Sequence, residues 1–110
     1  MAGTIVSKLS FGGNTAQLVR AGRCSVTSIK YLNEDSTTNY LQIFDAATAG
    51  SVTVGTTAPN YIMVALTKNQ DSHQGDTIHF DNGVVVVGTT TGTGSTGAAA
   101  ASQHVFLTVE

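Results

Sequence analysis

The sequence predicts an all-β protein, a compact antiparallel β-sandwich of about seven or eight short strands. β-branched and other apolar residues alternate with polar ones in short runs, and Gly, Asn, Asp and Thr separate the runs. No stretch sustains the i, i+3, i+4 apolar pattern of a helix. Strand spacings of about 8–15 residues favour a sandwich of the jelly-roll or immunoglobulin-like type.

The expected strands are short, and most show one apolar and one polar face. The run 84–87 is instead wholly Val, which predicts a strand covered on both faces. An Asn82-Gly83 turn precedes it. Residues 15–19 fit one helical turn, and residues 16–19 fit a strand equally well. The strands are expected at residues 4–9, 24–32, 39–44, 60–66, 77–80, 84–87 and 105–110.

The length of 110 residues fits one domain, residues 1–110. Two interpretations of residues 1–23 stay open: an N-terminal arm that orders on a partner, or the ordinary first strands of the sandwich. Residues 89–102 are rich in Thr, Gly and Ala and are expected to form a long exposed loop before the last strand.

Charged residues make up only 11% of the chain and the net charge is −2, so no basic patch for nucleic acid is expected. No apolar run reaches the roughly 18 residues of a membrane-spanning helix. The N-terminus lacks the basic and apolar regions of a secretory leader, which predicts synthesis in a cytoplasm. The single Cys24 allows no internal disulfide.

Two patterns resemble binding motifs, and both are interpreted as structural. Gly92-x-Gly94-x-x-Gly97 matches a dinucleotide fingerprint, but a strand follows it where that chemistry needs a helix. A His and Asp cluster spans residues 71–81, with 71 and 73 expected in a loop before strand 77–80. It is interpreted as a solvated polar segment, and a cation on His73, Asp76 and His79 stays open. No cofactor is expected.

Catalysis is not expected. The nucleophile elbow Gly-x-Ser-x-Gly is absent, and no carboxylate pair is spaced for general acid–base work. A sandwich of this size also leaves little room for a deep cleft. The chain is therefore expected to act through contacts at its surface, and five residues are candidates for that interface: Phe11, Tyr40, Gln42, Phe44 and Phe106.

Three elements in order carry a family resemblance: Asn-Tyr-Leu-Gln-Ile-Phe-Asp-Ala-Ala at residues 39–47, Val-Gly-Thr-Thr-Ala-Pro at 54–59, and Asp-Asn-Gly-Val at 81–84. With the Thr/Gly loop and the last strand, they resemble a group of small phage virion proteins of the capsid decoration, or cement, type. The match covers about two-thirds of the chain, and the N-terminal third departs from it.

The resemblance implies a protein of the virion surface that binds the major capsid protein and strengthens contacts between capsomers, commonly as a homotrimer. An alternative is a receptor- or glycan-binding module of a tail or fibre, for which Tyr40, Gln42 and Phe44 on one strand would supply the aromatic and amide contacts. A structural role in the tail or neck is a further alternative. Neither nucleic acid nor membrane is an expected partner.

Overall fold

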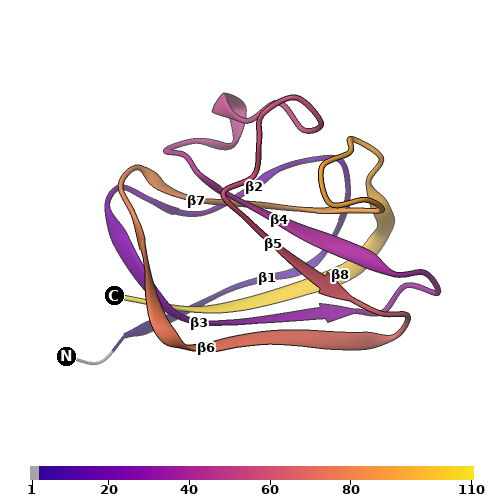
Figure 1. Cartoon of the computed structure of the whole chain (residues 1–110), viewed down its shortest axis with the longest axis horizontal. Helices are drawn as coiled ribbons and strands as arrows, with labels where there is room; N and C mark the ends of the chain where they lie inside the picture. Colours follow the sequence, from indigo (N-terminus) through magenta and orange to yellow (C-terminus); the bar gives the residue numbers. More distant parts are fainter. Residues whose placement is uncertain (1–2) are drawn as a thin grey trace.

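A computed structural model describes residues 3–110 of the chain, and it consists of eight strands and one short 3-10 turn, η1. The strands form two packed four-stranded sheets, as the sequence predicts (Figure 1). Sheet A has the order β1-β8-β3-β6 and sheet B the order β2-β7-β4-β5. The elements are β1 (Thr4–Gly13), β2 (Gln17–Ala21), β3 (Cys24–Asn33), β4 (Asn39–Asp45), η1 (Ala49–Ser51), β5 (Tyr61–Ala65), β6 (Asn69–Phe80), β7 (Gly83–Thr89) and β8 (Ala98–Val109).

The strand order decides between the two sandwich types. The antiparallel pairs β1–β8, β2–β7, β3–β6 and β4–β5 are nested inside one another, like one long hairpin rolled up so that its strands divide between two sheets. This arrangement is the eight-stranded jelly roll. The inner faces of the two sheets pack against each other. Each outer face is either covered by another segment or exposed to water.

Between the sheets lies a core of aliphatic and aromatic side chains. Val26, Tyr31, Leu41, Ile43, Val84, Val86 and Val105 are completely buried there. Val85 and Val87, on the opposite face of β7, belong to a second apolar cluster with Phe44 and Val52. The Val run is therefore buried on both faces, as predicted from its continuous apolar sequence.

The second cluster lies under the connection between β4 and β5, which folds back over the outer face of sheet B (Figure 1). We call residues 46–57 the cover. Thr48 accepts a hydrogen bond from the backbone N–H of Ser51 and so begins the 3-10 turn. Val52 and Val54 face inward from the cover onto Phe44 and β7.

The structure decides the open question of the N-terminal residues, and two boundaries differ from those expected. Residues 4–21 form β1 and β2, which pair with β8 and β7 within the sandwich, so the described part of residues 1–23 is no separate arm. Residues 98–102 belong to β8, so the loop is confined to 90–97. Residues 71 and 73 lie within β6, which starts at Asn69 instead of residue 77. Residues 1–2 of the expected arm lie outside the described residues.

In residues 3–110, no helix has the length and apolar character needed to cross a membrane. The hydrogen-bonded β-sheets instead supply the regular structure of the chain.

Two leucines of sheet A, one buried and one exposed, allow a test of how the core is packed. Leu107 in β8 is 1% exposed and Leu9 in β1 is 58% exposed. We expect Leu107→Ala to lower the free energy of unfolding by about 2–5 kcal/mol, because it leaves a cavity between the sheets. Leu9→Ala is the matched control and is expected to change it by roughly 0.5 kcal/mol or less. Denaturant unfolding measures both, and equal losses would contradict this packing.

Candidate functional site

An apolar stripe of three outward-facing side chains lies on β5 and the residue after it. Ile62, Val64 and Leu66 are 46%, 44% and 61% exposed, although they are aliphatic. They alternate with Met63 and Ala65, which face the core and are 8% and 1% exposed. We call Ile62, Val64 and Leu66 the β5 stripe.

The stripe is exposed because the cover stops short of it. The cover and its apolar cluster lie over β4, β7 and β2, whereas β5 is at the edge of sheet B. Tyr40 is paired with Val64 across β4 and β5, and it is half-buried beside the stripe. Both Tyr40 and Ile62 lie close to Gly92 of the 90–97 loop. The stripe therefore begins where the covered part of the outer face ends.

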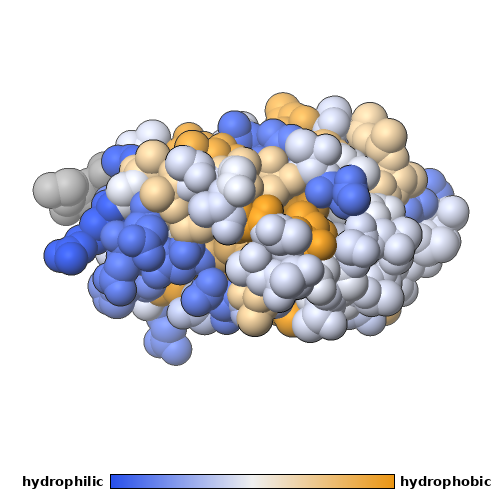
Figure 2. Space-filling model, turned by 90° about the horizontal axis from the view of Figure 1, so that it is seen from above, coloured by the Kyte–Doolittle hydropathy of each residue, from blue (hydrophilic) through white to orange (hydrophobic). Residues whose placement is uncertain are grey.

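The view onto this side of the molecule shows how polarity is distributed. In Figure 2, apolar side chains lie in the middle among weakly polar ones, and strongly hydrophilic side chains gather at the end that carries the N-terminus. The segment from Ala46 to Thr67, which comprises the cover and β5, has no charged residue at all. That absence was the sequence signal for an unusual surface, and the expected interface residues did not include the stripe.

Three of the five expected interface residues lie in the interior. Phe11 is 7%, Gln42 0% and Phe44 1% exposed, so their side chains are enclosed by this chain. Strand alternation correctly placed Gln42 and Phe44 opposite Leu41 and Ile43. The cover and the 90–97 loop then bury that outer face, which alternation alone does not reveal.

Gln42 fastens the Thr/Gly loop to the sheet. Its Nε2 donates to the Thr89 hydroxyl at 2.8 Å and to the backbone oxygens of Thr91 and Gly94 at 3.3 and 3.0 Å. These contacts are within the chain. The loop is therefore held by its own sheet.

The remaining two candidates, Tyr40 and Phe106, are half-buried and lie on opposite sides of the sandwich. Tyr40 is on the outer face of sheet B, because its neighbour Leu41 faces the core. Phe106 is on the outer face of sheet A, between Val105 and Leu107, which face the core. A single flat surface of a partner therefore cannot contact both Tyr40 and Phe106.

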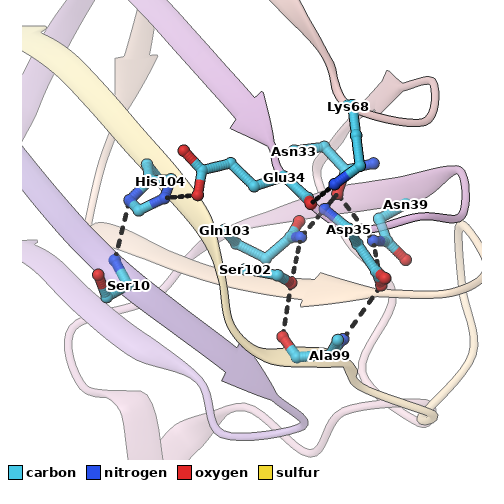
Figure 3. A network of polar contacts seen from close by, with 10 residues as sticks. All are labelled: Ser10, Asn33, Glu34, Asp35, Asn39, Lys68, Ala99, Ser102, Gln103 and His104. Carbon is cyan, nitrogen blue, oxygen red and sulfur yellow. Dashed lines mark hydrogen bonds and ion pairs between the residues drawn. The ribbon is translucent and has the colours of Figure 1, made fainter.

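At the end of the sandwich where β3, β4 and β8 meet, polar side chains form a connected network (Figure 3). The Asn33 Oδ1 accepts from Asn39 Nδ2 at 2.9 Å and from Gln103 Nε2 at 2.9 Å. The Asn33 Nδ2 donates to the backbone oxygens of Ala65 and Leu66 at 3.1 and 3.2 Å. Asn33 thus joins β3 and β8 in sheet A to β4 and the end of β5 in sheet B.

Gln103 reaches into the core because Gly88 leaves space for it. A Cβ atom on Gly88 would come within 2.9 Å of the Gln103 Cγ. The Tyr31 hydroxyl donates to the Gln103 Oε1, and burial raises the pKa of Tyr31, which keeps the phenol neutral and able to donate.

Asp35 and His104 extend the network to the surface (Figure 3). Asp35 accepts from the Asn39 side chain at 3.0 Å and from the backbone N–H of Ala99 at 3.3 Å. His104 accepts from the backbone N–H of Ser10 at its Nδ1, and its Nε2 lies 3.3 Å from the Glu34 carboxylate. Each contact ties a turn or an edge to the sheets, so this network serves the fold.

The His and Asp residues of β6 do not converge. His79 is paired with Ser25, and their Nδ1 and Oγ atoms are 2.9 Å apart on the outer face of sheet A. His73 is paired with the core residue Ile29, so it faces the other way, and its Nε2 contacts the backbone oxygen of Asp76. Among residues 3–110, no group of three or more His, Cys, Asp or Glu side chains is placed to hold a metal ion.

Asp45 closes the turn between β6 and β7. Its carboxylate accepts the backbone N–H groups of Asp81 at 3.0 Å, Asn82 at 2.8 Å and Gly83 at 3.3 Å. Burial acts to raise the pKa of Asp45, but these hydrogen bonds outweigh it and hold the pKa below its usual value. Gly83 has φ +147°, and a Cβ there would lie 2.6 Å from the Ala46 and Arg20 carbonyl oxygens.

This geometry predicts a loss of stability in acid. The contribution of Asp45 is fully present above the unfolded-state pKa of about 4 and is lost as the pH falls through the lower folded-state pKa. Asp45→Asn is expected to lower the free energy of unfolding at pH 7 by roughly 1 kcal/mol. The free energy of unfolding of this variant should also decrease less steeply with falling pH below pH ~4. Urea unfolding across pH measures this. Asp81→Asn, an exposed acid of the same turn, is the control, and identical profiles for the two variants would refute the assignment.

Comparison with known proteins yields little resemblance. No family model matches the chain, and no curated protein matches it. Among solved structures, the chain is similar to the one described as "Crystal structure of PirA", with 12% sequence identity and a TM-score of 0.42 over 100% of this chain and 94% of that chain.

Proposed function

We propose that this chain is a non-catalytic structural protein that acts by surface contact in a larger assembly, and that the assembly is a phage virion whose capsid it decorates. The observation that carries the proposal is the β5 stripe, three adjacent aliphatic side chains exposed on an uncharged sheet edge. Soluble proteins seldom leave such a surface uncovered unless it meets a partner.

The resemblance to small phage virion proteins supplies the kind of assembly. The residues that carry it have structural roles here: Phe44 anchors the cluster beneath the cover, and Asp45 closes the β6–β7 turn. Both residues therefore act within the sandwich. The resemblance therefore supports a shared architecture, and the docking contacts belong to other residues.

The weak charge of the surface suits this role. Many identical copies on one shell lie close together, and a net charge of −2 on 110 residues gives little mutual repulsion. The proposed partners are the major capsid protein and other copies of this chain. The proposed location is the outer capsid surface, after synthesis in the host cytoplasm.

The proposal gives the chain no catalytic step. The pair that comes nearest to a nucleophile with its base is Ser25 with His79. It lies on neighbouring strands of an outer face, and nucleophilic catalysis needs in addition a group that orients the His and donors for an oxyanion. Glycan binding by a tail or fibre module loses two of the three residues that suggested it, since Gln42 and Phe44 are enclosed.

Copy number in the particle tests the proposal. In virions purified from a phage that encodes this chain, quantitative mass spectrometry should find it at hundreds of copies, in a fixed ratio to the major capsid protein. A dozen copies or fewer would place it in the tail or neck, and complete absence would remove it from the virion. Either of these outcomes would overturn the decoration role.

A further inference from the structure

We propose that β5 pairs antiparallel with β5 of a second copy of this chain across a two-fold axis, so that the two B sheets form one continuous sheet. This contact rests on the proposed function only in being the contact between copies of the chain that the function includes. It is tested with the purified chain alone, so its failure is distinguishable from failure of the capsid role.

β5 differs from the other three edge strands. An edge strand offers unpaired backbone groups to any neighbouring strand, and proteins block this with charges and bulges. β1 carries Lys8 and two register shifts, and β2 carries Arg20 and one shift. β6 carries two Asp residues and an irregularity opposite β3. β5 has no charged residue, and its pairing with β4 is regular throughout.

Both faces of the β5 edge are mainly apolar, with His73 of β6 as the polar exception on the inner side. The β5 stripe lies on the outer face. On the inner face, a hollow opens between β5 and β6 and is lined by Tyr61, Met63 and Ile78 among others. A strand added at this edge would therefore bury apolar side chains on both sides while its backbone pairs with β5.

The lack of charge favours a copy of the chain itself as the partner. A two-fold axis places a residue that lies on it next to its own symmetry mate, so any charge close to the axis would come near the same charge. The chain is uncharged from Ala46 to Thr67, so β5 and its flanks meet their copies without that repulsion. A charged partner would find no complementary charge in this segment.

The sequence of β5 fixes the register. With the axis at Val64, Val64 faces Val64 of the copy, Ile62 faces Leu66 and Met63 faces Ala65. Every residue of 62–66 then meets an apolar residue, and the whole β5 stripe becomes one continuous apolar band. Moving the axis to Met63 would pair Ile62 with Val64 but leave Leu66 opposite the polar Asn60, so the β5 stripe would no longer pair wholly with itself.

Light scattering with size-exclusion chromatography tests the pairing. At about 100 μM, where a contact with a micromolar Kd is almost fully occupied, we expect a mass twice the 11.3 kDa of one chain. Val64→Lys places two ammonium groups face to face at the axis and is expected to weaken dimerisation at least tenfold. Ile5→Lys, on the 72% exposed Ile5 of edge β1, is the matched control and should remain dimeric.

A monomeric wild-type chain, a trimer such as the family resemblance implies, or a Val64→Lys variant that dimerises normally would each overturn the proposal. Thermal unfolding of both Lys variants checks that they fold. Because Val64 is 44% exposed, its replacement should leave the sandwich intact.

Disulfide trapping tests the register independently. Residues opposite each other in an antiparallel pair have Cα atoms about 4.5–5.5 Å apart, within the range that a disulfide spans. Val64→Cys should therefore form a covalent dimer under mild oxidation. Ile62→Cys alone should not, because Leu66 faces it, whereas Ile62→Cys combined with Leu66→Cys should. The native Cys24 is 5% exposed and so protected. Cross-linking of the Ile62→Cys variant but not of the Val64→Cys variant would overturn the register.

Discussion

The carboxamide of Asn33 holds the two sheets together at one end of the sandwich. It lies at the end of β3, is 2% exposed, and bonds to residues of β4, β8 and the end of β5. A buried amide that lost these partners would be costly, because neither water nor another side chain would replace them. These contacts therefore favour one relative position of the two sheets at this end.

The same constraint positions the exposed surface. The Asn33 Nδ2 binds the backbone oxygens of Ala65 and Leu66, so the end of β5 is fixed where the apolar stripe ends. At the other end of β5, the backbone N–H of Asn60 donates to the Ile43 oxygen and its side chain accepts from Asp45. The stripe is thus a preformed feature that needs no rearrangement to meet a partner.

The sequence predicts the strands of this fold well where their polarity pattern is simple. Val84–Val87 could be assigned as doubly covered because no residue in it is polar. β6 was placed too late in the chain because its first half is polar and includes Gly75 at φ +109°, which resembles a loop. The small residues of Ala98–Ser102 resemble a loop in the sequence, although pairing of β8 with β1 and β3 draws them into the sheet.

The exposure of the β5 stripe was harder to predict from the sequence than the strands themselves. Alternation tells which residues of a strand share a face, but not whether a distant segment covers that face. Gln42 and Ile62 are cross-strand partners on the same outer face, and the cover together with the 90–97 loop buries the first and leaves the second exposed. That outcome depends on how far the connection after β4 extends across the sheet.

The nested pairing of the strands also has a consequence for synthesis. β1 pairs with β8 and β2 with β7, so the earliest strands find their partners only after nearly the whole chain has left the ribosome. Before β6 emerges, β4 and β5 are the one pair of partner strands able to form, and the apolar side chains of this hairpin lack the opposite sheet. Chains with such non-local strand pairing fold slowly, and their partly folded intermediates expose apolar surface. Neighbouring nascent chains on one polysome would meet through that exposed hairpin, which favours their aggregation during synthesis.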